Sequence, residues 1–177
     1  SDHKRYWNVF KPICDEFEKR KIPLVFYTSS EDDPALSCKY EYVKAEFIGS
    51  GNKAFAKLNF LNAGILLSTT PGLDVYQWKR SKNTAWYVHI PHSADELAGY
   101  RMFGLDYYDA VLTTGQNQVD LIRKIESLRS GIAKKEIVTV GSVTLDNLKK
   151  RYDSVPEKVQ NEKPVILLAP SWGVSGI

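Results

Sequence analysis

Two of the three histidines in this 177-residue chain, His89 and His92, lie close together at the end of a predicted strand. The strand is the apolar, aromatic and β-branched run at about 84–89, and Pro91 marks the turn that follows it. Because an imidazole titrates near neutral pH, a histidine just beyond a strand can act as a general base. We therefore name His92 as the candidate catalytic residue, against the alternative of a surface or capping histidine. His89 lies within the apolar run, which is typical of a packed side chain.

Hydroxyl and glycine residues beyond the predicted strands are the first candidates for substrate binding. Ser93 follows His92 directly, and Thr114 and Gly115 follow a second apolar run at about 109–113. Backbone amides at the start of a helix can hold a phosphate group, and glycine lets a ligand approach the backbone closely. The spacing matches neither the dinucleotide-binding fingerprint nor the P-loop, and a tight turn is the alternative.

Lys79 and Arg80 are further candidates for substrate binding, and they lie with Lys82 in a basic segment before the central strand. Such a segment can meet a phosphate-rich substrate or anionic lipid headgroups, and a solvated loop is the alternative. The net charge of +3 is too small to indicate a nucleic-acid partner. Cys14 and Cys38 form no CxxC pair and no HExxH motif occurs, so the sequence predicts no metal site and no cofactor.

Strands and helices alternate along the sequence, which predicts the α/β class. Short apolar strands between amphipathic helices favour a Rossmann-like parallel sheet with helices on both faces. Asp33 before Pro34, Asn52 and Ser142 are the expected helix N-caps. The predicted strands lie at about 23–28, 43–48, 65–69, 84–89, 109–113, 136–140 and 165–169, and the longer helices at about 6–20, 52–61, 117–129 and 142–152.

The composition divides the chain into three parts. Residues 1–152 are predicted to form the Rossmann-like domain, the polar segment 153–163 suits a linker, and 164–177 start a second α/β domain. An apolar strand followed at once by a glycine-containing loop predicts that this second domain is truncated. No apolar run approaches the roughly 20 residues that span a bilayer, and no signal peptide is visible, so we expect a cytoplasmic protein.

Four segments resemble the motifs of one known family. YVHIPHSADEL is similar to a strand followed by His-Gly-Thr-Pro, with His92 on the motif's histidine and Ser93 in place of its glycine. GLDYYDAVLTTGQNQVDLIRK is similar to a strand-to-helix segment in which Asp109, Thr113 and Thr114 match. GSVTLDNL is similar to a Gly-x-Pro-Arg-x-Asp-x-Leu element, and VILLAPSWG to an apolar strand ending in Ala-Pro-Thr-Trp. These motifs resemble those of the CDP-glycerol glycerophosphotransferases, which build teichoic-acid-type polymers within the GT-B glycosyltransferase superfamily.

The resemblance implies that the chain is the N-terminal, acceptor-side half of a GT-B fold. His92 would then deprotonate an acceptor hydroxyl, while a nucleotide-activated donor similar to CDP-glycerol would bind mainly to the second domain, which is almost wholly missing here. The acceptor would be membrane-linked or polymeric, which implies a peripheral position on the inner face of the cell membrane. The fragment alone is expected to be inactive.

Two alternatives stay open. The element GSVTLDNL is closer to the Gly-Asn-Thr-Val-x-Asp element of UDP-N-acetylglucosamine 2-epimerases, which share the two-domain fold. An epimerase or another GT-B glycosyltransferase is therefore the second hypothesis. The third is a non-catalytic α/β binding domain, which predicts that His92 is packed or bonded away from any open surface.

Overall fold

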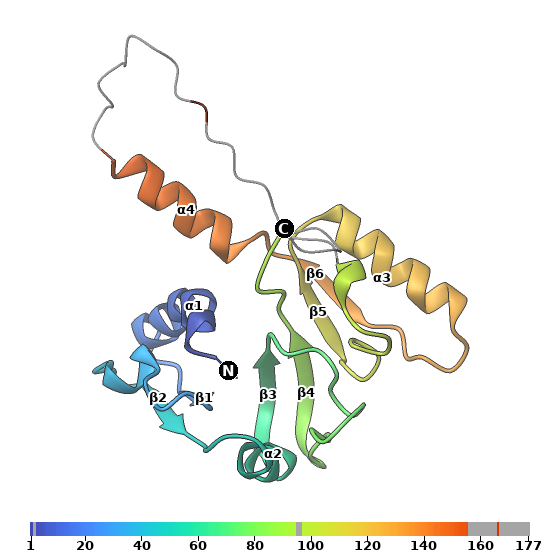
Figure 1. Cartoon of the computed structure of the whole chain (residues 1–177), viewed down its shortest axis with the longest axis horizontal. Helices are drawn as coiled ribbons and strands as arrows, with labels where there is room; N and C mark the ends of the chain where they lie inside the picture. Colours follow the sequence, from blue (N-terminus) through green and yellow to red (C-terminus); the bar gives the residue numbers. More distant parts are fainter. Residues whose placement is uncertain (2, 95–96, 156–165, 167–177) are drawn as a thin grey trace.

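The structure is a computed structural model that describes residues 1, 3–94, 97–155 and 166. Helices alternate with strands, and all paired strands are parallel (Figure 1). This arrangement confirms the predicted α/β class. The helices are η1 (Lys4–Tyr6), α1 (Trp7–Lys19), η2 (Pro34–Ser37), α2 (Asn52–Asn59), η3 (Leu97–Gly99), α3 (Gln116–Leu128) and α4 (Val143–Asp153). The strands are β1 (Leu24–Thr28), β2 (Val43–Phe47), β3 (Asn62–Ser68), β4 (Asn83–His89), β5 (Ala110–Thr113) and β6 (Glu136–Thr139).

The described strands form two parallel sheets instead of one continuous sheet. β1 pairs with β2, and the second sheet has the order β3-β4-β5-β6. Ser1 occupies the edge of β1 that faces β3, because its amino group donates to the carbonyl of Tyr27 at 2.6 Å and its carbonyl accepts from the amide of Ser29 at 3.0 Å. This edge of β1 is therefore hydrogen-bonded to Ser1 and not to β3.

The amphipathic helix α1 packs on both sheets. Its buried side chains Trp7 and Phe10 contact the ring of Phe26 in β1 edge-on, with ring centroids 5.0 and 5.5 Å apart. The same apolar cluster includes Leu67 from β3 and Leu112 from β5. The predicted apolar face of this helix is thus confirmed, and it joins the two sheets through side-chain packing.

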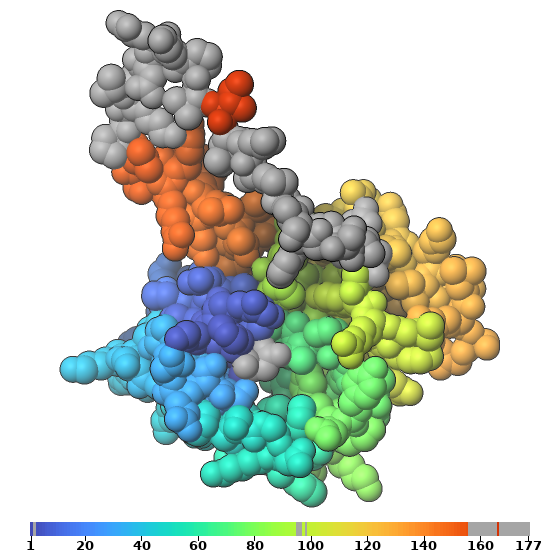
Figure 2. All heavy atoms as spheres, viewed as in Figure 1, coloured from blue at the N-terminus to red at the C-terminus, as the bar shows by residue number. Residues whose placement is uncertain are grey.

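Pro12 lies inside α1 and explains how α4 is attached. A proline has no amide hydrogen, so the carbonyl four residues earlier, at Asn8, loses its helical partner. In the structure, the Asn147 side-chain amide of α4 donates to that carbonyl at 3.0 Å. Figure 2 shows the orange atoms of α4 directly against the blue atoms of α1. Pro12 therefore leaves a backbone carbonyl of α1 to which α4, a helix distant in sequence, is hydrogen-bonded.

Helices cover opposite faces of the four-stranded sheet, as predicted. Leu112 packs against the α1 cluster, whereas its neighbour Val111 packs with Ile122 of α3. Successive residues of a strand point to opposite faces, so α1 and α3 lie on different sides of the sheet. A further core is formed by Leu73 and Trp78 of the segment between β3 and β4, with Tyr87 of β4 and Tyr108 before β5.

The predicted N-caps are confirmed at two of three positions. The Asp33 carboxylate accepts from the amide of Ala35 at 3.0 Å, and the Ser142 hydroxyl accepts from the amide of Leu145. Asn52 was expected to cap α2, but the cap is Gly51, whose φ of +56° suits glycine. The predicted linker 153–163 and strand 165–169 fall almost entirely outside the described residues. No helix of the described chain is long and apolar enough to cross a membrane.

Candidate functional site

A pocket of about 460 Å³ opens at the carboxyl ends of β5 and β6. Three loops contribute to its lining: Ala94 follows β4, Thr114 and Gly115 follow β5, and Gly141 and Ser142 follow β6. Open parallel sheets bind ligands at this edge, beyond the carboxyl ends of their strands. The structure thus brings two of the residues predicted to bind substrate, Thr114 and Gly115, into one pocket.

The first turns of α3 and α4 complete the described lining of the pocket. They contribute Gln116, Asn117, Gln118, Leu145 and Asp146, of which only Asp146 carries a charge. The amino end of each helix also leaves backbone N–H groups without an intrahelical partner and carries a partial positive charge. A wall of amides and hydroxyls with one carboxylate offers donors and acceptors that suit neutral hydroxyl groups.

Local hydrogen bonds hold the pocket walls in place. The amide of Thr114 donates to the side-chain oxygen of Gln118 at 2.8 Å, and Gln118 is buried. Gly141 has φ +81°, a conformation that other residues rarely adopt, and it turns the chain into the Ser142 cap of α4. Both strand-to-helix turns are therefore fixed by their own sequence.

His92 lies next to the pocket, but it is not among the residues that line it. The side chain is half-buried, and its ring packs edge-on against the ring of Tyr6, with centroids 5.0 Å apart. Its Nδ1 is buried and has no hydrogen-bond partner among the described residues. The His92 carbonyl accepts from the hydroxyl of Thr144 at 3.1 Å, which ties this loop to the first turn of α4. Ser93, also half-buried, separates His92 from the lining residue Ala94.

His89 is fully buried and lies among tyrosines. Its Nε2 is 2.9 Å from the hydroxyl of Tyr100, and its ring packs edge-on against Tyr100 and Tyr108. Burial, together with the nearby charge of His92, lowers the pKa of His89 to about 3. The imidazole is therefore neutral near pH 7, which agrees with the packing role expected for it.

Arg80 makes structural contacts at the other end of β5. Its guanidinium donates to both carboxylate oxygens of Asp109, at 3.1 and 2.9 Å, and to the carbonyl of Tyr107 at 2.6 Å. It also lies over the ring of Tyr87, 4.6 Å from the centroid. All of its recorded contacts are thus made within the fold.

Lys79 and Arg80 are not brought to the pocket. The ammonium of Lys79 donates to the carbonyl of Asp74 at 3.1 Å, in the same segment. Asp109, the partner of Arg80, precedes β5, whereas Thr114 follows it. The basic segment and the pocket therefore lie at opposite ends of that strand.

Most of the described pocket lining, apart from Thr114 and Gly115, was not predicted from the sequence. Asp146 and Gln118 line the pocket, and Tyr6 packs on His92. A carboxylate one turn after the Ser142 cap is a signal that could have indicated Asp146. No local pattern predicts Tyr6, because it lies just before α1 and is distant from His92 in the sequence.

Comparisons of the chain with protein-family models, with curated proteins and with solved structures found no match. Among the described residues, no group of three or more histidine, cysteine or acidic side chains could hold a metal ion.

Proposed function

We propose that this chain is the acceptor-side domain of a GT-B-type transferase related to the CDP-glycerol glycerophosphotransferases. The enzyme would move a glycerophosphate, or a related group, from a nucleotide-activated donor to an acceptor hydroxyl in the synthesis of a cell-surface polymer. The motif segments support this family, and the position of the pocket at the carboxyl edge of the sheet supports a ligand-binding role.

One observation carries the proposal: His92 lies beside a polar pocket with its ring free of hydrogen bonds to the described residues. The Thr144 hydroxyl bond fixes the His92 loop against α4, whose first turn contributes Asp146 to the lining. A base needs an unpaired nitrogen that the substrate can reach. Because Nδ1 of His92 is buried, Nε2 would have to take the proton.

The pocket suits the hydroxyl-bearing end of an acceptor. In the proposed reaction, an acceptor oxygen attacks the donor phosphorus while the bond from phosphorus to the leaving nucleotide breaks. His92 takes the hydroxyl proton, and Thr114, Gly115 and Asp146 orient the acceptor. Positioning of the reacting groups and stabilisation of charge on the leaving group supply most of the rate in such transfers.

The donor would bind mainly to a second, nucleotide-binding domain. A membrane-linked or polymeric acceptor implies a protein at the inner face of the cell membrane. Ser93 retains its proposed contact with substrate, because it lies between His92 and the pocket residue Ala94. Lys79 and Arg80, at the far end of β5, are no longer part of the proposed substrate site.

The test is a transfer assay on the full-length protein with CDP-glycerol and a glycerol-phosphate oligomer. The His92→Ala variant should lose about 10²- to 10⁴-fold in turnover, the usual contribution of a general base. The exposed His3 provides the matched control, so His3→Ala should keep full turnover. Turnover of His92→Ala within about twofold of the wild type, with unchanged thermal unfolding, would refute the role of His92.

A nucleotide-sugar epimerase is the second candidate. Gly141, Ser142 and Asp146 belong to the element that resembles the epimerases, and all three line the pocket. Product analysis of the full-length protein with UDP-N-acetylglucosamine separates the two candidates. Formation of the epimer, without transfer from CDP-glycerol, would favour this second reaction.

A further inference from the structure

The first turn of α4 makes contacts in two directions. Asp146 lines the pocket, whereas two residues close to it, Thr144 and Asn147, form hydrogen bonds outside the helix. The Thr144 hydroxyl donates to the carbonyl of His92 at 3.1 Å. The Asn147 side-chain amide donates to the carbonyl of Asn8 at 3.0 Å. Residues three apart are neighbours on a helix surface, so one face of this turn is bonded both to the His92 loop and to α1.

The amino end of α1 also contacts the His92 ring. Tyr6, the N-cap of α1, packs edge-on against the imidazole, with ring centroids 5.0 Å apart. Asn8, which accepts the bond from α4, lies two residues further along. Contacts thus join His92 to α4, α4 to α1, and α1 back to His92. This closed set of contacts fixes the imidazole relative to the first turn of α4, and therefore relative to Asp146.

The bond from Thr144 to His92 lies at the surface of the molecule. The Thr144 side chain is exposed, so water can replace the bond when it is lost. A hydrogen bond between groups that water can reach adds little net stability to a fold. Removal of the Thr144 hydroxyl should therefore change the position of the His92 loop more than the free energy of unfolding.

We propose that Thr144 is a positioning residue for His92. Its hydroxyl holds the His92 loop on α4, so that the imidazole keeps one separation from the Asp146 carboxylate, which orients the acceptor. A proton is transferred only within hydrogen-bond reach, and a misplacement of about 1 Å can lower a rate about 10²-fold. This role rests on the proposed function, because it presumes that His92 is the base.

The kinetic test uses the full-length protein with CDP-glycerol and a glycerol-phosphate oligomer. Thr144→Val keeps the shape of the side chain but removes the hydroxyl, and it should lower kcat about 10- to 100-fold. The KM for CDP-glycerol should stay within about twofold of the wild type, since the donor binds mainly to the second domain. Thr144→Ser keeps the hydroxyl and should recover most of the lost turnover. Equal losses in the two variants would overturn the inference.

A double-mutant cycle shows whether Thr144 acts through His92. In the His92→Ala background, Thr144→Val should cause no further loss of turnover, because the group that Thr144 positions is gone. The same loss in both backgrounds overturns the inference and leaves His92 as the base, as does wild-type turnover in Thr144→Val. Wild-type turnover in His92→Ala instead refutes the base itself, and the role of Thr144 with it.

The position of the imidazole can also be measured without a substrate. In the isotope-labelled 177-residue chain, nuclear Overhauser contacts should be observed between the rings of His92 and Tyr6. These contacts should weaken in Thr144→Val and persist in Thr144→Ser. Unchanged contacts in Thr144→Val would show that the hydroxyl does not hold the ring in place, and would overturn the inference.

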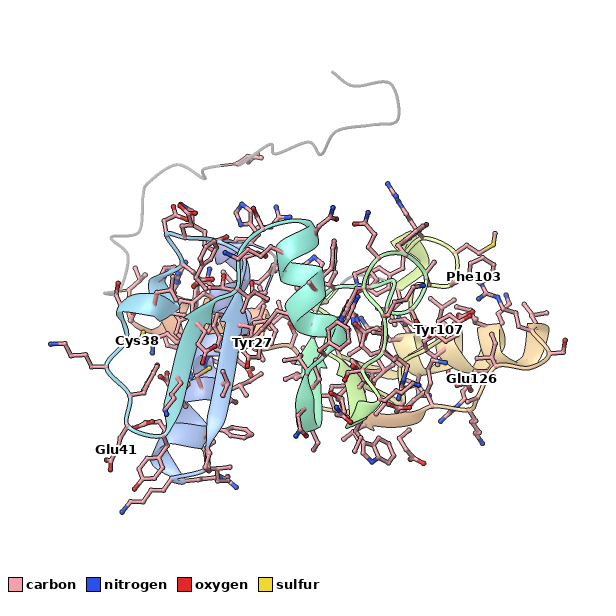
Figure 3. The ribbon with its side chains drawn as sticks, turned by 90° about the horizontal axis from the view of Figure 1, so that it is seen from below. Tyr27, Cys38, Glu41, Phe103, Tyr107 and Glu126 are labelled. Carbon is pink, nitrogen blue, oxygen red and sulfur yellow. The ribbon has the colours of Figure 1, made fainter. Side chains whose placement is uncertain are left out.

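Ser127 gives the matched control for both measurements. Its hydroxyl donates to the carbonyl of Lys124 at 2.7 Å, in an exposed bond near the carboxyl end of α3. Figure 3 shows the neighbouring Glu126 well away from Tyr27 of β1, the strand on which α1 packs. Ser127→Ala therefore removes a comparable surface bond far from Tyr6, and it should keep both the ring contacts and the turnover of the wild type.

Discussion

At the scale of single residues, two histidines three positions apart have different surroundings. His89 is fully buried and shares a hydrogen bond with Tyr100, whereas His92 is half-buried with its ring unpaired. The sequence alone distinguished them, because His89 lies in an apolar run and His92 lies beyond a proline. It could not supply the tyrosines around each imidazole, since Tyr6 and Tyr100 come from other parts of the chain.

The buried His89 should make the fold sensitive to acid. Its pKa falls from an ordinary value of 6.5 to about 3 in the folded chain, chiefly because burial disfavours the charged ring. The unfolded chain therefore takes up a proton that the folded chain rejects as the pH falls below about 6.5. The free energy of unfolding should decrease by up to about 1.4 kcal/mol per pH unit in this range. Urea unfolding at a series of pH values from about 7 to about 5 measures it.

The variants for this experiment are His89→Gln and His3→Gln. Replacing His89 should flatten the dependence on pH, whereas replacing the exposed His3 should leave the wild-type slope. A wild-type slope in His89→Gln would show that another group causes the acid sensitivity. The slopes are compared, not the absolute stabilities, because any change at a buried position also alters packing.

At the scale of elements, the sequence predicted which segments are helices and strands, but not the bonds that join them. Ser142 and Asp33 cap their helices as expected, since capping depends on neighbouring residues only. The pairing of Asn147 with the carbonyl freed by Pro12 depends on the tertiary fold, so no local pattern predicts it. The structural role of Arg80 was not predicted for the same reason. Its sequence neighbours suggest a binding loop, and its partner Asp109 is known only from the fold.

Arg80 should contribute to stability by joining the segment before β4 to the start of β5. Arg80→Gln removes a two-bond ion pair with Asp109 that is about two-thirds buried. The Asp109 carboxylate then keeps the backbone amide of Tyr87, 2.7 Å away, as a partner. We expect a loss of about 1–3 kcal/mol in the free energy of unfolding, measured in urea. Lys82→Gln, in the same segment but exposed, should change it by less than about 0.5 kcal/mol. Equal effects of the two substitutions would mean that the ion pair adds no stability.

At the scale of the whole molecule, the prediction of the α/β class succeeded because strand and helix periodicities alternate clearly. The division into two sheets was not predicted, because local sequence patterns do not show which strand edges pair. The pocket was predicted only in part. Thr114 and Gly115 were found from their place after a strand, whereas Asp146 enters from a helix whose position depends on α1.

The two ends of β5 differ in the whole molecule. Its carboxyl end, with that of β6, holds the polar pocket, and His92 lies beside it. Before its first residue, Arg80 is bonded to Asp109 and to the carbonyl of Tyr107. The proposed acceptor site and the ion pair that supports the fold can therefore be tested by separate substitutions.

The most direct test of the central claim is a nuclear magnetic resonance titration of the isotope-labelled chain with a glycerol-phosphate oligomer. The account predicts that the amide signals of Thr114, Gly115 and Ser142 shift most. It also predicts that Asp146→Ala, which removes the acceptor oxygens, weakens binding by about tenfold, the effect of one lost hydrogen bond to a charged group. Shifts confined to the segment around Arg80, or no shifts at all, would contradict the claim that this edge of the sheet binds the acceptor.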